Sequence, residues 1–210
     1  KDGNKDLDLN NRREESRNNM LKVIKNLTDE DVKNIYFFTL TAPTGIGKTL
    51  SSLQSALALQ ERIYKIQGYT PRIITAIPFI NIIEQNKTEY ENVFGKDSKI
   101  VVDHRLSDFS AGSLNREEIP IDKALLETES WEGSVILTTF VKFFQSLFTG
   151  RNKALKKINK LAGSIVILDE VQAIPECYMP IIGAALQMIA IFFGTKFILM
   201  TATQPKILEF

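Results

Sequence analysis

The chain has 210 residues, 44% of them hydrophobic, which is enough to build one large packed core. Its 26 lysines and arginines nearly balance 25 aspartates and glutamates, and the net charge of +1 neither demands nor excludes a nucleic-acid partner. Any basic surface must therefore be local. With a single cysteine, Cys177, the chain cannot form an internal disulfide, which suits a reducing compartment. Residues Lys1 to Arg17 lack the apolar stretch of a signal peptide, so we expect a cytoplasmic protein.

The alternation of helical and β-branched stretches predicts an α/β fold. For residues 1–30 we predict a polar leader and a charged helix within Leu9 to Asn26. For residues 31–210 we predict one domain with a mainly parallel central sheet flanked by helices. We expect strands at Tyr36–Thr41, Arg72–Ile77, Lys99–Val102, Ser134–Thr138, Ser164–Leu168 and Lys196–Met200. We expect helices at Thr49–Ile66, Ile80–Val93, Phe140–Phe148 and Met179–Phe193. The chain begins without methionine and stops just after the last strand, so we expect a piece of a longer protein.

The first strand opens directly into a glycine-bearing loop, Ala42-Pro43-Thr44-Gly45-Ile46-Gly47-Lys48-Thr49, and then a helix. Glycines let backbone N–H groups approach a polyphosphate closely, and a helix N-terminus adds its dipole. Lys48 would place an ammonium on the β- and γ-phosphates, and the Thr49 hydroxyl would bind the accompanying Mg²⁺. Only Ala42 departs from the pattern G-x-x-x-x-G-K-[ST]. We predict a nucleoside triphosphate site at Thr44, Gly45, Ile46, Gly47, Lys48, Thr49 and Leu50, with an ordinary glycine turn before a helix as the alternative.

Two carboxylates follow the strand at Ser164–Leu168, at the edge where open α/β sheets hold ligands. We predict that Asp169 holds the magnesium ion, through water and opposite Thr49, and that Glu170 orients or deprotonates an attacking water. A charge pair at a helix N-terminus is the alternative. The next strand closes with Thr201 and Thr203, whose hydroxyls would face the γ-phosphate; on its own this triplet is only a capping or turn signal.

Three other stretches receive structural predictions. Asp103 to Pro120 mixes Gly, Ser, Asn and charge, which predicts an irregular surface loop that contains the only histidine, His104. Arg151 to Lys160 predicts a basic amphipathic helix or turn with a solvated face, and contact with a phosphate backbone is the alternative. Ile181 to Met200 is strongly apolar, but Gly194 to Lys196 divides it into a buried helix and a strand, each too short to cross a bilayer.

The three motifs together resemble motifs I, II and III of superfamily 2 helicases. They are the glycine loop, Asp169-Glu170-Val171-Gln172 and Thr201-Ala202-Thr203, in that order. The flanking stretches Ile77 to Asn86, Thr138 to Phe140 and Met200 to Pro205 resemble the CRISPR-associated helicase–nuclease of type I interference, a similarity that runs from about Leu9 to Pro205.

This resemblance implies a RecA-like P-loop domain, the first of two in an ATP-dependent motor that moves on single-stranded DNA recruited by the crRNA-guided Cascade complex. It implies ATP and Mg²⁺ as cofactors, Lys48 and Glu170 as catalytic residues, and Gln172, Thr201 and Thr203 as residues that couple hydrolysis to movement. Contacts with the DNA backbone are implied for Pro78, Phe79, Gln85, Thr138 and Thr139.

The resemblance also implies two partner domains, a second RecA-like domain and a metal-dependent HD nuclease. One histidine is too few for the nuclease, so that domain would lie elsewhere in the protein or on a partner chain. Without the second wall of the ATP cleft, we expect this domain alone to be nearly inactive.

Two other functions are compatible with a phosphate-binding loop. One is a binding module that uses nucleotide only to switch contacts with a partner, and the other is a P-loop ATPase or kinase without unwinding activity. A DEAD-box RNA helicase is disfavoured, because the acidic box ends in Gln172 rather than aspartate and no glutamine precedes Gln54.

Overall fold

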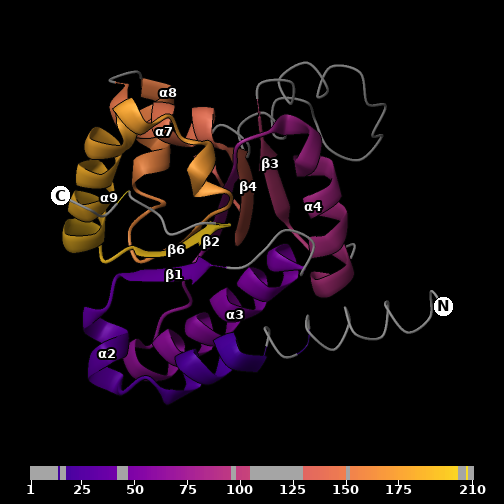
Figure 1. The fold of residues 1–210 in the computed structure, drawn as a ribbon, viewed down its shortest axis with the longest axis vertical. Helices are drawn as coiled ribbons and strands as arrows, with labels where there is room; N and C mark the ends of the chain where they lie inside the picture. The colour runs from indigo at the N-terminus through magenta and orange to yellow at the C-terminus, as the bar shows by residue number, and fades with distance from the viewer. Residues whose placement is uncertain are drawn as a thin grey trace.

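The computed structural model describes residues 14, 18–41, 47–95, 98–104, 130–149, 152–202 and 207 (Figure 1). Six described strands form one parallel sheet in the order β1-β6-β5-β2-β4-β3. The strands are β1 Phe37–Thr41, β2 Ile73–Ile77, β3 Ile100–Asp103, β4 Val135–Thr139, β5 Ile165–Leu168 and β6 Lys196–Thr201. The predicted α/β fold with a parallel central sheet is therefore confirmed, and every strand lies within one residue of its predicted bounds.

Helices follow most strands, as a parallel sheet requires. The described helices are α2 Asp29–Asn34, α3 Lys48–Gln67, α4 Ile80–Phe94, α7 Phe140–Phe148, α8 Asn152–Ile158 and α9 Met179–Phe193; α2 precedes β1, and α8 follows α7. Two single 3₁₀ turns, Val171–Ala173 and Glu176–Tyr178, lie between β5 and α9, and residues 18–26 are helical. The four helices predicted from the sequence are confirmed, with bounds that coincide for α7 and α9.

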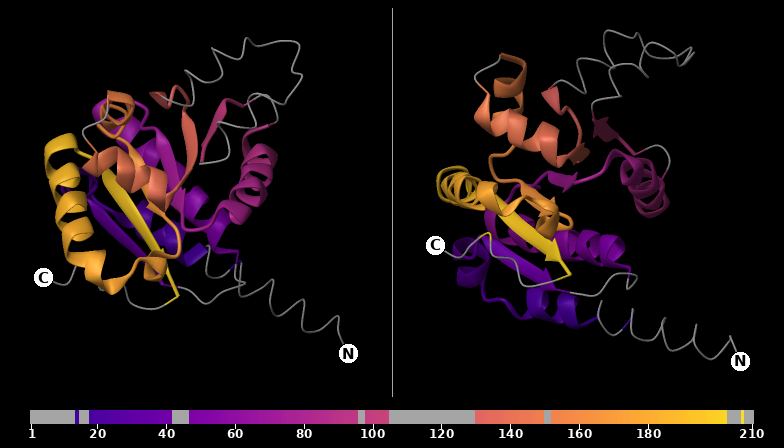
Figure 2. Two further views of the ribbon diagram at one scale, coloured as in Figure 1. Left: turned by 90° about the horizontal axis from the view of Figure 1, so that it is seen from above. Right: turned by 45° about the horizontal axis from the view of Figure 1, so that its top comes forward.

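The sheet separates two hydrophobic cores, because successive side chains of a strand point to opposite faces. Ile74, Val166 and Leu199 face α7 and α9 in one core. Ile73, Ile167 and other strand residues of the second core pack with residues of α2, α3 and α4, such as Leu53 and Tyr90. Figure 2 shows α2 and α3 on one side of the sheet and α7 and α9 on the other. The central strands β2, β4, β5 and β6 are buried along their whole length.

The prediction of an irregular surface loop from Asp103 to Pro120 is wrong at its start. Asp103 ends β3 and is 1% exposed, and His104 directly after it is also buried. A buried carboxylate needs cations or hydrogen-bond donors around it, and the sequence alone did not predict which residues would supply them. Residues 105–120 lie outside the described part of the chain.

Helix α9 is less buried than the sequence predicts. Its inner residues, such as Leu186 and Ala190, are fully buried, but Met188, Ile191 and Phe192 each expose more than half of their surface. Within the described residues, Glu176–Phe193 is the one segment that is long and apolar enough to cross a bilayer by length and composition, which is also true of the core helix of many soluble proteins.

Candidate functional site

Three neighbouring strands end together at one edge of the sheet and bring the three sequence motifs there. In the strand order, β6 lies between β1 and β5, so the segments after these strands are adjacent although they are far apart in the sequence. The glycine loop follows β1, Asp169 and Glu170 follow β5, and Thr201 ends β6. This is the carboxyl edge, where parallel sheets place their ligand sites.

The last glycine of the loop forms the entry to α3. Gly47 has φ +74°, a left-handed conformation that glycine adopts without steric cost, and no side chain caps the helix that begins at Lys48. The first turn of α3, which contains Thr49 and Leu50, therefore offers backbone N–H groups to an anion. Thr44, Gly45 and Ile46 lie outside the described residues.

Lys48 and Glu170, 122 positions apart, form an ion pair at this edge. Lys48 Nζ lies 2.8 Å from Glu170 Oε1, and the lysine is 8% exposed. The other carboxylate oxygen, Oε2, accepts a hydrogen bond from Gln172 Nε2. Glu170 adopts φ +55°, which is uncommon for a residue with a side chain and is typical of functional sites. Both oxygens of Glu170 are thus held by residues of the predicted motifs.

Asp169 is nearly buried and has an oxygen without a partner. Its backbone N–H donates to Ala76 O at 3.0 Å, which fixes the end of β5 against β2. The carboxylate is 8% exposed, and its Oδ1 accepts no hydrogen bond. Burial, reinforced by the charge of Glu170, raises the pKa of Asp169 to about 6, and Lys48 opposes that shift.

A carboxylate oxygen of Asp169 without a partner, close enough to Lys48 to feel its charge, fits a magnesium ion, which prefers oxygen ligands and keeps much of its water. Among the described residues, no group of three or more His, Cys, Asp or Glu side chains could hold a metal by itself. A magnesium ion at Asp169 would therefore depend on the nucleotide phosphates and water for its other ligands.

The predicted coupling residues are only partly described. Thr201 is fully buried at the end of β6, beside Thr41 of β1 in the strand register. Gln172 is exposed and contacts Glu170 as stated above. Thr203 lies outside the described residues.

The residues predicted to contact DNA divide into two groups. After β2, Pro78 is half-buried, Phe79 is 58% exposed, and Gln85 is exposed on α4 with its Nε2 3.4 Å from Glu89 Oε1. After β4, Thr139 Oγ1 accepts the Lys142 N–H and so caps α7. Thr138 is fully buried and donates to Asp103 O at 2.9 Å, so its side chain faces the interior and the prediction that it contacts DNA is corrected.

Asp103 is the centre of a buried polar cluster that sequence reasoning missed. Its Oδ2 accepts hydrogen bonds from Lys157 Nζ at 2.6 Å and Trp131 Nε1 at 2.8 Å, and Lys142 Nζ lies 3.7 Å from Oδ1. Lys157 is 8% exposed and also lies over the Trp131 ring. The predicted solvated face of Arg151 to Lys160 is therefore wrong for Lys157, because this cation joins α8 to the end of β3.

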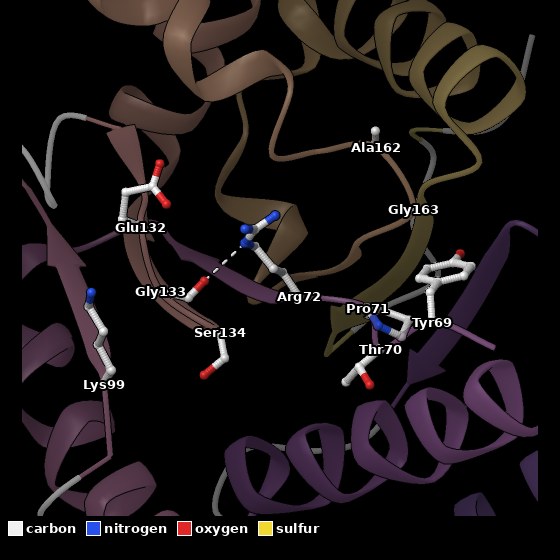
Figure 3. A pocket seen from close by; sticks show the side chains of 10 residues that line it. All are labelled: Tyr69, Thr70, Pro71, Arg72, Lys99, Glu132, Gly133, Ser134, Ala162 and Gly163. Atoms are coloured by element: carbon white, nitrogen blue, oxygen red, sulfur yellow. Dashed lines mark hydrogen bonds between the residues drawn. The ribbon is translucent and has the colours of Figure 1, made fainter.

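A hollow of about 540 Å³ lies at the opposite, amino edge of the sheet (Figure 3). Arg72, Lys99 and Ser134, the residues directly before β2, β3 and β4, help to line it. Figure 3 shows Arg72 reaching across to the carbonyl oxygen of Gly133, to which its Nε donates at 3.1 Å. The length of the strands separates this hollow from Lys48 and Asp169. The hollow is therefore not part of the site that the three motifs form.

Comparison with known proteins agrees with this arrangement. The sequence profile of the DEAD/DEAH box helicases matches residues 18–210. The chain belongs to that family. It is 32% identical to "CRISPR-associated nuclease/helicase Cas3" of Haloferax volcanii over 96% of its own length, which confirms the resemblance to the first helicase domain of the CRISPR-associated enzymes. The chain spans about a quarter of that relative, 23% of its length.

Two solved structures show the same fold. The crystal structure of T. fusca Cas3 with ADP superposes with a TM-score of 0.64 at 19% identity, over 88% of this helicase domain and 21% of that chain. The DEAD-box helicase Mss116 bound to single-stranded RNA and UDP-BeF superposes with a TM-score of 0.56 at 15% identity, over 91% of this domain and 36% of that chain. The RecA-like fold is therefore confirmed by structural similarity.

Proposed function

We propose that this chain is the ATP-binding first motor domain of a single-stranded DNA translocase of type I CRISPR interference. The observation that carries the proposal is the contact of Lys48 with Glu170 at 2.8 Å, because it joins the glycine loop to the acidic motif across 122 positions of sequence. A structural ion pair alone would not also leave Asp169 Oδ1 without a partner in the same place.

The residues at the carboxyl edge have separate roles in the proposed site. The N–H groups at the start of α3 and the Lys48 ammonium bind the phosphate tail, and Thr49 and Asp169 hold Mg²⁺. Bound Mg²⁺ would supply a charge that neutralises the phosphate oxygens as negative charge develops. Glu170 would orient the attacking water and accept its proton, which requires a freely accepting carboxylate.

The hydrogen bonds of Glu170 suggest how binding prepares the site. Lys48 Nζ cannot stay at 2.8 Å from Glu170 and also lie on the phosphates, so nucleotide binding would take Lys48 away. Gln172 would then remain as the donor that holds Glu170 in place. In this scheme Gln172 is a positioning residue, and Thr201 and Thr203 report the state of the γ-phosphate to the rest of the motor.

The DNA would cross the segments that follow β2 and β4. Phe79 offers an exposed aromatic ring to a base, and Pro78, Gln85 and the start of α7 at Thr139 lie after the same two strands. The similarity to Cas3 supports a crRNA-guided effector complex as the source of that DNA, and a second RecA-like domain and an HD nuclease as partners in the complete protein.

The test is ATP turnover by an extended polypeptide that adds the second RecA-like domain, measured with and without single-stranded DNA. We expect DNA to stimulate turnover, Lys48→Ala to abolish it, and Phe79→Ala to weaken the stimulation. Phe192→Ala is the matched control, because Phe192 is an exposed aromatic residue, 71% exposed, on α9, which follows neither β2 nor β4. The chain of 210 residues alone should turn over very slowly.

ATP turnover that DNA does not stimulate, and that Lys48→Ala does not reduce, would contradict the proposed DNA motor. Nucleotide binding that changes the affinity for a partner, without strand movement, would instead favour a nucleotide-dependent binding module. Robust turnover by the isolated 210 residues would contradict the need for a second domain.

A further inference from the structure

Helix α4 carries a buried amide whose donor has no partner. Asn86 is 1% exposed, and its Nδ2 donates no hydrogen bond. In the described part of the chain, the other buried side-chain atoms in this condition are Gln54 Oε1 and Asp169 Oδ1. An unsatisfied buried polar group costs about 1 to 3 kcal/mol, so such groups are almost always satisfied by water or by a neighbour.

Asn86 and Asp169 face the same side of the sheet. Ile165 and Ile167 of β5 belong to the core with α3 and α4, and the two-residue period of a strand places Asp169 on that face too. On α4 the buried residues are Ile83, Asn86 and Tyr90, whose spacing of three and four residues defines one helical face. That face packs on the sheet, because Tyr90 belongs to the same core.

The two side chains also lie at the same height along the sheet. Tyr90 Oη lies 2.9 Å from Thr75 Oγ1, and Thr75 stands beside Ile167 in the strand register. Asp169 is two residues beyond Ile167, about 7 Å closer to the carboxyl edge. Asn86 is four residues before Tyr90, about 6 Å along α4 toward its start, which follows the carboxyl end of β2.

Electrostatics agrees with this placement. Burial raises the pKa of Tyr90, and the negative charge of Asp169 adds to that shift, which agrees with the two groups lying on the same side of the sheet. Asn86 lies one helical turn closer to the edge that carries Asp169 than Tyr90 does. The unpartnered donor and the unpartnered acceptor therefore lie on the same side of the sheet and toward the same edge.

We propose that Asn86 is a positioning residue for Asp169, through one buried water that accepts a hydrogen bond from Asn86 Nδ2 and donates one to Asp169 Oδ1. Two polar partners are enough to hold a buried water, and a carboxylate oxygen has a second lone pair left for a metal or its water. The inference rests on the proposed function, in which Asp169 holds the magnesium ion.

This link would join the ATP site to the DNA-facing segment. Helix α4 begins at Ile80, directly after Pro78 and Phe79, and the water fixes one turn of that helix to the metal-binding carboxylate. A shift of α4 on DNA would then change the orientation of Asp169. The device needs no contact between DNA and the nucleotide.

The test compares fluorescent ADP binding to the 210-residue chain in EDTA and over a magnesium series. The variants are Asn86→Leu, which removes the donor but keeps the branched shape of the side chain, Asn86→Asp, which replaces the donor with an acceptor, and Asn86→Ser, which keeps a donor. Changes in the partners of metal ligands typically cost 10- to 100-fold in metal affinity. We expect Asn86→Leu and Asn86→Asp to need about tenfold more magnesium than wild type for the half-maximal effect on ADP binding. Their ADP affinity in EDTA should stay within about twofold of wild type. Asn86→Ser should behave like wild type in both conditions.

Tyr90→Phe is the matched control, because it removes another buried polar group from the same face of α4, and thermal unfolding is followed for all variants. A magnesium requirement of Asn86→Leu and Asn86→Asp equal to that of Tyr90→Phe would overturn the inference. An equal loss in EDTA and in magnesium would overturn it as well, since it would indicate general damage. A wild-type chain that binds nucleotide without any magnesium effect would overturn the proposed role of Asp169 itself.

Discussion

Replacing Asp169 by asparagine should stabilise the nucleotide-free protein while removing its magnesium response. The Asp169 carboxylate is 8% exposed, and burial together with the charge of Glu170 raises its pKa to about 6 from an ordinary value of 3.8. Its charged form is therefore held in an unfavourable place. Asparagine keeps the shape and an acceptor oxygen without the charge.

The magnitude follows from that pKa difference. About two pKa units at about 1.4 kcal/mol each give a stabilisation of about 3 kcal/mol for Asp169→Asn at pH 8. For a chain of this size each kcal/mol moves the melting temperature by about 2 to 4 °C, so we expect a rise of about 6 to 12 °C. Because the folded protein binds this proton more tightly than the unfolded chain, wild-type stability is penalised above about pH 6, and the penalty disappears as the pH falls toward 3.8.

The assay is thermal unfolding of both proteins, without nucleotide, at several pH values from 8 down to 4.5. The difference in melting temperature should be largest at pH 8 and shrink steadily below pH 6. An Asp169→Asn variant less stable than wild type at pH 8, or a difference that does not change with pH, would refute the description of Asp169 as a strained, buried charge.

Two further predictions come from the same electrostatics. Magnesium-dependent nucleotide affinity should fall by up to about tenfold per pH unit below pH 6, as Asp169 takes up a proton. Nucleotide affinity of Asp169→Asn should keep only the pH dependence that comes from protonation of the nucleotide itself, so a profile equal to that of wild type would contradict this role of Asp169. Asp103→Asn should lower the free energy of unfolding, measured in urea, by about 3 to 5 kcal/mol, because it leaves buried Lys157 without its counter-charge. The control Glu132→Gln breaks the exposed ion pair with Lys160 and should lower it by less than about 1 kcal/mol. Equal losses in the two variants would contradict the buried cluster around Asp103.

Much of the fold could be predicted from the sequence because central parallel strands are apolar on both faces. Ile73 to Ile77 and Val135 to Thr139 contain almost no charge, and turns or polar residues bound them clearly, so their limits shift by only one residue. Helix α7 begins at a threonine that caps it, a local signal. Local patterns thus carry most of the secondary structure.

The long-range contacts could not be predicted in the same way. Lys157 was expected in solvent because it stands among other lysines, and only the fold brings it to Asp103, 54 positions away. Thr138 has the residue type of a phosphate contact, but its position in a buried strand directs its hydroxyl to Asp103. The exposed residues of α9, such as Phe192, are as apolar as its buried ones, so composition did not separate the two faces.

The candidate site was predicted by motif spacing rather than by periodicity. The loop at Gly47 and Lys48 and the pair Asp169 and Glu170 are each recognisable locally, but that they meet depends on the strand order, which places β1 and β5 on either side of β6. The role of Gln172 as a donor to Glu170, and the unpartnered buried donor of Asn86, could be seen only in the three-dimensional arrangement.

The central claim is that Lys48 and Asp169 belong to one magnesium-nucleotide site, and the most direct measurement is a titration of the chain with a fluorescent ATP analogue, with and without Mg²⁺. The account predicts saturable binding that magnesium strengthens, and a loss of about tenfold or more in Lys48→Ala, which removes the charge that binds the phosphates. No saturable signal, or equal affinity of wild type and Lys48→Ala, would contradict it.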